Sequence, residues 1–285
     1  MSKKVILYAD STCDLGPALC EQYGVHLMPY HIGLDGKEYR DNVDIHVKEL
    51  YDAWYERKLL PKTSAISTGE YIDAFTPWLK DGYEIVHINL GSALSASYQN
   101  CVLAAQELEG VYPIDSKNLS SGTGHLVIEA AKLRDQGASA AEIQAGIQAM
   151  TGRVHASFIL DTLEFMHAGG RCSTVAMLGA NMLSLKPCIE VNNESGSMSV
   201  GKKYRGRLLN VEKQYIRDKL AAYRNIRTDK IFITYSLTDE EYVNSARETI
   251  ESVMHFDRIY TTNASCTIAS HCGPNTLGIL FMTED

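Results

Sequence analysis

Apolar and polar residues alternate along the first half of the chain in a pattern that predicts strands and helices in turn. Short apolar runs rich in β-branched residues are typical of buried strands and occur at 4–9, 25–34, 85–90 and 111–114. Apolar residues at helical spacing predict helices at 17–23, 47–54, 67–79, 99–108, 121–133 and 139–150. Strands separated by helices are typical of a doubly wound parallel sheet.

The pattern changes after Gly152, where a hairpin is mixed with further strands and helices. Residues 188–192 and 198–204 predict paired strands, and other strands are expected at 155–160, 230–236, 258–263 and 277–282. Helices are expected at 173–185, 208–223 and 239–254. The sequence therefore predicts an α/β protein of two domains: an N-terminal Rossmann-like domain with a parallel sheet at 1–152, and a C-terminal α+β domain with a mostly antiparallel sheet at 153–285.

Composition and charge argue against one class of partner. The 285 residues are 45% hydrophobic and 22% charged, as in an ordinary globular protein, and the formal net charge is −8. We expect no nucleic-acid partner, because the scattered Lys and Arg residues form no basic stripe. The one locally basic stretch, 202–207, is either a solvated hairpin face or a docking loop for another subunit.

The cysteines and the N-terminus bear on metal binding and location. The seven cysteines are an odd number without a C-x-x-C pair, so neither a disulfide framework nor a metal site is expected. No apolar run reaches about 18 residues, and the N-terminus leads into a strand pattern rather than a signal peptide. We therefore expect a cytoplasmic protein with no stable membrane insertion.

Small polar residues follow three predicted strands of the first domain, at Asp10-Ser11-Thr12, Gly91-Ser92 and Asp115-Ser116. Because the carboxyl ends of parallel strands share one edge of a sheet, these groups are expected to surround a crevice that Thr63 and Ser64 could join from a loop. Hydroxyls and free backbone N–H groups at a helix N-terminus suit a carboxylate or a phosphate. The alternative interpretation is that Ser92 or Ser95 only caps a helix.

Two glycine-rich stretches of the second domain contain further candidates for this site, a cationic Arg and a His imidazole. Gly169-Gly170-Arg171 either lets an anion approach the backbone beside a guanidinium or is a turn with a solvated Arg. His271 precedes a Gly-Pro turn and is either a structural or a functional group. The nucleophile elbow, the Walker A loop, the dinucleotide-binding glycine motif and the H-E-x-x-H motif are missing. These residues predict an anion-binding site with no catalytic residue, because nothing activates a nucleophile.

Together these motifs resemble the DegV family of bacterial fatty-acid-binding proteins. The resemblance covers the whole chain and rests on Asp10-Ser11-Thr12-Cys13-Asp14, Tyr39-Arg40-Asp41, Pro61-Lys62-Thr63-Ser64, Ser92-Ala93-Leu94-Ser95, Asp115-Ser116, Gly169-Gly170-Arg171, Leu185-Lys186-Pro187 and His271-Cys272-Gly273-Pro274. It implies one bound long-chain fatty acid, such as palmitate, with its carboxylate at the domain interface and its tail in an apolar tunnel. It also implies a lipid-carrying, non-catalytic subunit without another cofactor, which presents the fatty acid to a separate ATP-binding fatty acid kinase subunit for acyl phosphate formation or otherwise serves lipid transport.

The resemblance also implies roles for single residues. Thr63 and Ser92 would hydrogen-bond the carboxylate, His271 and Arg171 would lie close by, and the secondary contacts would be Ser64, Gly91 and Ser95. The apolar residues that would line the tunnel, or simply belong to the core, are Val175, Met177, Leu178, Met182, Leu183 and Leu185.

The chain departs from the family pattern at Ala65-Ile66, Gly91, Ala96-Ser97 and Asn275, whereas Thr63, Ser92 and His271 are retained. Two alternatives remain beside the lipid-binding function. One is an enzyme that acts on a small phosphorylated or carboxylated metabolite in the same crevice. The other is a regulatory or structural binding protein without a lipid.

Overall fold

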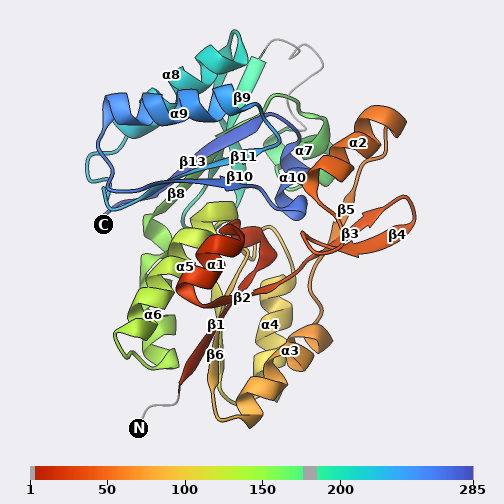
Figure 1. The fold of residues 1–285 in the computed structure, drawn as a ribbon, viewed down its shortest axis with the longest axis vertical. Coiled ribbons are helices and arrows are strands. Elements are labelled where there is room, and N and C mark those ends of the chain that lie inside the picture. The colour runs from red at the N-terminus through yellow and green to blue at the C-terminus, as the bar shows by residue number, and fades with distance from the viewer. Residues whose placement is uncertain (1–3, 176–184, 285) are drawn as a thin grey trace.

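The structure, a computed structural model, describes residues 4–175 and 185–284. Its strands form a four-stranded, a six-stranded and a three-stranded sheet. Figure 1 shows the four-stranded sheet in the lower half of the molecule, the six-stranded sheet in the upper half and the small sheet at one side. Helix α5 (Ser120–Asp135) lies between the two larger sheets.

The four-stranded sheet belongs to the N-terminal part of the chain and is wholly parallel. Its order is β2-β1-β6-β7, and its strands are β1 (Val5–Asp10), β2 (Val25–Met28), β6 (Glu84–Asn89) and β7 (Val111–Asp115). Besides α5, the helices that contact this sheet are α1 (Gly16–Tyr23), α3 (Thr68–Lys80), α4 (Ser97–Glu107) and α6 (Ala140–Met150). A parallel sheet with helices on its faces confirms the predicted Rossmann-like α/β architecture.

Local sequence signals account for the ends of these helices. Ser67 accepts a hydrogen bond from the Glu70 N–H while Glu70 accepts one from the Ser67 N–H, which completes the predicted capping box of α3. Ser139 and Glu142 make the same pair of bonds at the start of α6. Gly24 ends α1 with a φ of 58°, a conformation that glycine adopts without strain.

The six-stranded sheet is built from residues after Gly152, in the order β10-β9-β8-β13-β11-β12. Its strands are β8 (Val154–Ile159), β9 (Leu185–Val191), β10 (Met198–Arg205), β11 (Ile231–Ser236), β12 (Ile259–Asn263) and β13 (Thr276–Met282). All neighbouring pairs are antiparallel except β11 with β12. The predicted mostly antiparallel sheet, with its β9–β10 hairpin, is therefore confirmed.

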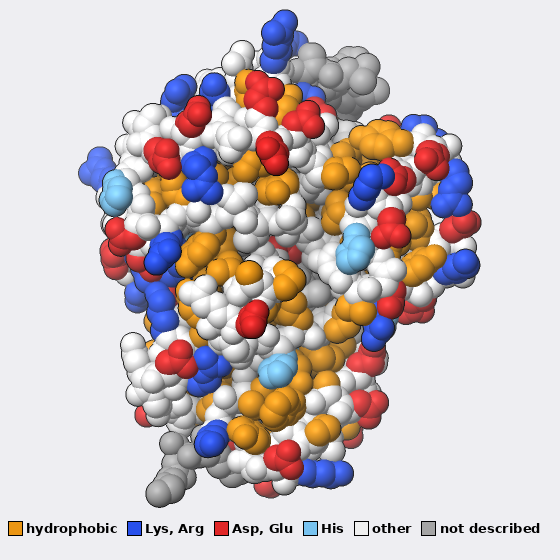
Figure 2. All heavy atoms as spheres, in the orientation of Figure 1, with side chains coloured by type: hydrophobic (Ala, Val, Ile, Leu, Met, Phe, Trp, Pro, Cys, Tyr) orange, Lys and Arg blue, Asp and Glu red, His pale blue; other side chains and the backbone are white. Residues whose placement is uncertain are grey.

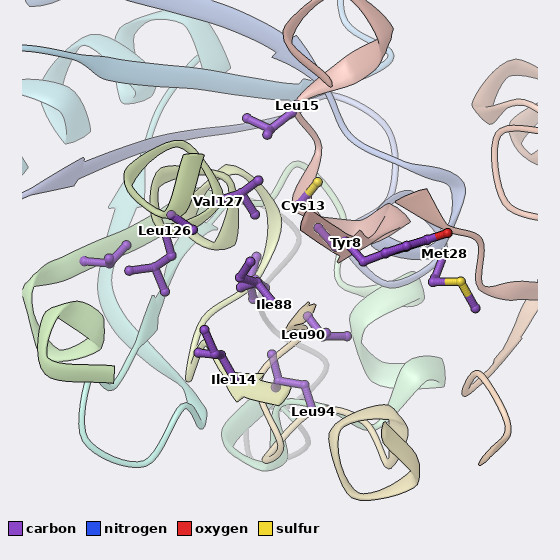
Figure 3. Close-up of a cluster of buried hydrophobic side chains, with 14 of the residues drawn as sticks. Tyr8, Cys13, Leu15, Met28, Ile88, Leu90, Leu94, Ile114, Leu126 and Val127 are labelled. Carbon is purple, nitrogen blue, oxygen red and sulfur yellow. The ribbon is translucent and has the colours of Figure 1, made fainter. Parts of the chain in front are cut away.

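Helices cover both faces of the six-stranded sheet. α8 (Leu208–Ala221) and α9 (Glu240–Val253) pack on its outer face around a cluster of apolar side chains. α5 contacts β8, β11 and β13 on the inner face, and β1 and β6 of the other sheet. Residues 120–131 of α5 are all buried, and Figure 3 shows Leu126 and Val127 with Ile88 and Ile114 in the main apolar cluster. One core thus joins the two larger sheets.

One predicted strand, 25–34, is wrong because it forms two strands in different sheets. β2 belongs to the parallel sheet, whereas β3 (His31–Leu34) pairs with β4 (Lys37–Arg40) and β5 (Lys62–Ser64). Pro29 separates β2 from β3, since proline has no N–H to donate to a ladder. The β3–β4 turn at Asp35-Gly36 is as predicted, with positive φ angles of 53° and 72°.

The three-stranded sheet and α2 (Val47–Arg57) pack against the second half of the chain. Ile32 and Tyr51 share an apolar cluster with Phe165 of α7 (Glu164–Gly169) and Ala269 of α10 (Cys266–Cys272). Short 3-10 turns occur at Ser11–Cys13, Thr151–Arg153 and Ser173–Val175. A domain boundary at residue 152 stays a prediction, because residues 31–64 reach across it.

The helix expected over 173–185 lies mostly outside the described residues. The described parts are the 3-10 turn Ser173–Val175 and Leu185, which begins β9. Four residues expected to line a tunnel are outside the described ranges: Met177, Leu178, Met182 and Leu183.

Two carboxylates of the N-terminal part hold the first turn of α10. Asp14 accepts the Ser265 N–H at 2.9 Å, and Asp41 accepts the N–H groups of Cys266 at 2.8 Å and Thr267 at 3.3 Å. The Ser265 hydroxyl accepts the remaining free N–H of that turn, so the helix start is fully paired. Burial raises the pKa of Asp14 to about 7 and the pKa of Asp41 above its usual range. We call Asp14 and Asp41 the carboxylate clamp.

Replacement of a clamp residue tests this arrangement. We expect Asp41→Ala to lower the free energy of unfolding by about 2–4 kcal/mol, because two buried N–H groups and the Ser11 hydroxyl lose their acceptor. Asp44→Ala is the matched control, since Asp44 pairs only with Arg40 on the surface and its loss should have no measurable effect. Urea unfolding compares the two variants, and equal stability would contradict the clamp.

Candidate functional site

A cavity lies where α10, β5 and the turn after β6 approach β8. Its volume is about 740 Å³, including space open to solvent. Its polar lining includes Tyr30, Thr63, Ser64, Ser95, Arg171 and His271, and its apolar lining includes Leu90, Leu94, Phe158, Met166, Met198 and Ile268. Five of the predicted site residues therefore share this cavity, which we call the outer chamber.

Thr63 and His271 are in contact although they are far apart in the sequence. The Thr63 hydroxyl oxygen lies 2.9 Å from His271 Nε2. Strand β5 presents Thr63 through its pairing with Ile32, and α10 presents His271 in its last turn. Thr63 was expected in a loop, whereas it lies in a strand that the sequence pattern did not predict.

The protonation state of His271 decides whether the Thr63 hydroxyl can donate its hydrogen to a ligand. Burial, and next the Arg171 charge, lower the pKa of His271 to about 4, so the ring is neutral at pH 7. If the proton is on Nε2, the ring donates to Thr63 and leaves an unpaired lone pair on the buried Nδ1. The other tautomer would bury an unpaired N–H, which is the rarer arrangement. We therefore assign the proton to Nε2, which leaves the Thr63 hydroxyl hydrogen for a ligand.

Ser95 is another hydroxyl residue of the outer chamber, and protein groups already donate hydrogen bonds to its oxygen. It accepts hydrogen bonds from the Ser97 N–H at 3.2 Å and from the Tyr30 hydroxyl at 3.0 Å. Its own hydrogen can reach Ser97 Oγ at 3.3 Å or an acceptor in the chamber. Tyr30 also lies 3.4 Å from Asp10, a fully buried carboxylate that accepts the Leu90 N–H at 2.7 Å and contacts other buried polar groups.

Ser92 and Gly91, both predicted site residues, do not line the chamber. Ser92 donates its hydroxyl at 2.5 Å and its N–H at 3.0 Å to the Asp115 carboxylate at the end of the neighbouring strand. Gly91 packs on the backbone of Asn118, where a Cβ would lie 3.0 Å from the nitrogen and oxygen atoms. The strand ends do meet at one edge, but the structure brings Ser95 rather than Ser92 into the chamber with Thr63.

Arg171 and Gly169 complete the polar end of the outer chamber. Arg171 is exposed, and its guanidinium donates to the Gly169 carbonyl at 2.7 Å. Gly169 packs on the imidazole of His271, because a Cβ at this position would lie only 2.1 Å from Nδ1. The glycine thus allows close contact with the ring, and the arginine places a positive charge where the chamber meets the surface.

A smaller hollow, the inner chamber, adjoins the outer one. Its volume is about 340 Å³, including space open to solvent, and both chambers are lined by Leu119, Phe158, Ile268 and Cys272. Its five serine and threonine residues all have partners within the protein: Ser120 with Asp14, Ser157 with Tyr215, Thr234 with Ser121 and Thr262, Ser236 with Tyr51, and Thr276 with the Cys272 carbonyl. The inner chamber therefore presents an apolar surface to any ligand.

Residues 4–175 and 185–284 contain neither a metal-binding cluster nor a membrane-spanning helix. Within these ranges no three His, Cys, Asp or Glu side chains are grouped so that they could hold a metal ion. None of the helices described there is long and apolar enough to cross a membrane. On the face drawn in Figure 2, Lys and Arg side chains are interspersed with Asp and Glu side chains rather than gathered in one patch.

Comparison with known proteins identifies the family. Residues 4–284 match the family model described as "Uncharacterised protein, DegV family". This chain belongs to the DegV family. A DegV domain-containing protein of Caldanaerobacter subterraneus subsp. tengcongensis is 31% identical over 284 residues, which cover 98% of this chain and 99% of that protein. The resemblance inferred from the sequence motifs is therefore confirmed.

Solved DegV structures share the fold over nearly the full length. A Thermus thermophilus DegV family protein, described by its fatty acid binding, superposes with a TM-score of 0.88 at 26% identity and covers 98% of this chain and 99% of its own. A stearic acid-binding protein from Eubacterium ventriosum superposes with a TM-score of 0.82 at 24% identity, over 100% of this chain and 99% of its own. The second similarity establishes the fold alone.

The departures from the family pattern have local structural reasons. Asn275 has a φ of 56°, which asparagine tolerates better than most residues other than glycine, and its amide donates to Asp161 at 3.1 Å. Ser97 accepts the N–H of the buried Ile66 at 3.1 Å. Ala65 and Ala96 line the outer chamber, where their small side chains leave room for a ligand.

Sequence reasoning missed Tyr30, Asp10 and the residues of the inner chamber. Tyr30 follows Pro29 and lies 65 residues from Ser95 in the sequence, so no spacing pattern could connect them. Asp10 was noted only as a polar residue at a strand end. Phe158 lies in a predicted strand, where an apolar residue gives no sign of a nearby cavity.

The packing of Gly169 on His271 can be tested by adding a single methyl group. We expect Gly169→Ala to displace the His271 ring and to lower the free energy of unfolding by about 1–3 kcal/mol, because the new Cβ would overlap the ring. Gly152→Ala is the control, since a Cβ there meets nothing within 4 Å. Denaturant unfolding and the imidazole NMR signals of His271 measure both effects. Unchanged His271 signals in Gly169→Ala would show that the contact does not position the ring.

Proposed function

We propose that this chain binds one long-chain fatty acid in its outer and inner chambers. The carboxylate would lie at Thr63, Ser95 and His271, with Arg171 nearby and Ser64 as a secondary contact. The tail would extend past Phe158 into the inner chamber. The observation that supports this proposal most directly is that a chamber with a polar end shares four lining residues with an apolar chamber whose serine and threonine hydroxyls are already paired.

The polar end suits an ionised carboxylate because the available groups are donors. A carboxylate only accepts hydrogen bonds, and a buried one without donors would cost several kcal/mol. Thr63 and Ser95 already accept bonds from protein groups, so each hydroxyl can direct its hydrogen to the ligand. The Arg171 guanidinium adds a positive charge on the open side.

Burial of the tail would supply most of the affinity. At roughly 0.8 kcal/mol for each buried CH₂, about 15 methylenes offer on the order of 12 kcal/mol before the costs of association. The inner chamber favours such a tail because its serine and threonine hydroxyls are already bonded to protein groups, which leaves a mainly apolar lining. An enzyme acting on a small polar metabolite would require the opposite lining.

Relatives support the same class of ligand. The Thermus thermophilus protein is described by its fatty acid binding and shares 26% of its sequence with this chain. The two proteins align over nearly their full lengths, so they share the fold that forms the two chambers in this chain.

We further propose that the chain is a non-catalytic subunit that presents its fatty acid to an ATP-binding kinase subunit. The described groups around the outer chamber can hold a carboxylate but include no activated nucleophile, because His271 donates its Nε2 proton to Thr63 and its Nδ1 is buried against Gly169. The exposed Arg171 would lie where a partner could reach the carboxylate. Phosphoryl transfer would then require ATP and a catalytic site supplied by the partner.

The head-group assignment can be tested with two serines from the same turn. We expect Ser95→Ala to weaken palmitate binding about 10–100-fold, because a hydrogen bond to a charged group contributes about 1.5–3 kcal/mol. Ser92→Ala is the matched control and should leave the affinity nearly unchanged, since Ser92 is bonded to Asp115. Isothermal titration calorimetry measures both. The lipid-binding proposal is wrong if the unsubstituted protein does not bind palmitate, and the head-group assignment is wrong if Ser92→Ala has the larger effect.

Presentation to a kinase can be separated from binding at Arg171. We expect palmitate-loaded Arg171→Ala to keep its ligand but to support acyl phosphate formation by a fatty acid kinase subunit much more slowly, because the exposed guanidinium is lost where the two subunits would meet. Arg205→Ala, on the basic hairpin, is the control for a docking role of residues 202–207. Equal rates for Arg171→Ala and the unsubstituted protein would contradict a role of Arg171 in presentation.

A further inference from the structure

Four residues form the border between the two chambers, and Phe158 has the largest side chain among them. Leu119, Phe158, Ile268 and Cys272 line both chambers. Ile268 and Cys272 belong to α10, whose first turn is held by the carboxylate clamp. Leu119 immediately precedes α5, the helix that lies between the two larger sheets. Phe158 instead belongs to strand β8, so its side chain can move without moving either helix.

The strand pairing leaves room beside the Phe158 ring. Phe158 of β8 lies directly opposite Gly278 of β13 in the antiparallel register, so the ring faces a residue without a side chain on the same face of the sheet. A Cβ at Gly278 would lie 2.7 Å from the Ser157 carbonyl oxygen and 3.0 Å from Phe158 Cβ. Gly278 also lines the inner chamber, so the space beside the ring belongs to that chamber.

We propose that Phe158 sets the length of the acyl tail that the chain accepts. In this arrangement a short tail ends at the ring in the outer chamber. A longer tail turns the ring toward Gly278 and enters the inner chamber. The inference rests on the proposed binding of a fatty acid and adds to it which residue selects among chain lengths.

The energetics favour this use of the inner chamber. Rotation about the Phe158 Cα–Cβ bond carries the ring from one staggered position to another, and the missing side chain at Gly278 leaves room beside it. The apolar side chains that line the inner chamber offer few partners to an ordered water, so an entering tail displaces little bound water. Each methylene beyond the ring therefore gains the full benefit of burial, and affinity should continue to rise with chain length past Phe158.

Enlarging the side chain at this border tests the inference. We expect Phe158→Trp to bind laurate like the unsubstituted protein and to bind stearate more weakly, by about tenfold for every two methylenes that no longer enter the inner chamber. Phe158→Leu should favour stearate and arachidate over laurate more strongly than the unsubstituted protein does. Phe256→Leu is the control, because Phe256 is buried in a separate apolar cluster and lines neither chamber, so its variant should keep the original order of affinities.

Calorimetric titration with laurate, myristate, palmitate, stearate and arachidate gives the order of affinities for each variant. If the unsubstituted protein binds palmitate but both Phe158 variants keep its chain-length order, Phe158 is not the selecting residue while the proposed function stands. If the unsubstituted protein binds none of the five acids, the proposed function and this inference both fail.

Crystal structures of the unsubstituted protein with laurate and with stearate test the same inference without any substitution. The expected result is a filled inner chamber and a turned Phe158 ring with stearate, and an empty inner chamber with laurate. A stearate tail that leaves the inner chamber empty would overturn the inference while showing that the fatty acid binds.

Discussion

The site depends on the hydrogen bonds that two buried carboxylates make with the first turn of α10. Asp14 follows β1 and Asp41 follows β4, yet both accept N–H groups from a helix near the other end of the chain. Because α10 has only two turns, a fixed first turn also fixes His271 in the last one. The contact between His271 and Thr63 therefore follows from the clamp, and with it the meeting of the two halves of the chain at the outer chamber.

The direction of the hydrogen bonds around the chambers determines which ligand they suit. At the outer chamber, protein donors occupy the acceptor positions of Thr63 and Ser95, which leaves hydroxyl hydrogens for an acceptor-only group such as a carboxylate. In the inner chamber, every serine and threonine hydroxyl is paired within the protein, so the surface it offers to a ligand is mainly apolar. A molecule with a carboxylate at one end and a long hydrocarbon tail satisfies both chambers.

Much of the fold, but less of the site, could be predicted from the sequence. Hydrophobic periodicity and capping boxes such as Ser67 with Glu70 are local signals, and they identified most helices and strands. The break at Pro29 was also a local signal that the long apolar run 25–34 concealed. The sequence could not show whether Ser92 or Ser95 lies in the outer chamber, because both belong to one turn. Ser92 is instead hydrogen-bonded to Asp115, and Ser95 lines the chamber. The partnership of Tyr30 with Ser95 likewise exists only after two distant segments meet.

Native mass spectrometry of the freshly purified protein, followed by denaturation and extraction of whatever it carries, tests the central claim most directly. The account predicts one fatty acid for each chain, released on denaturation and long enough to reach the inner chamber. A protein that carries no lipid and takes up neither added palmitate nor added oleate would contradict the account and would favour a different ligand for the two chambers.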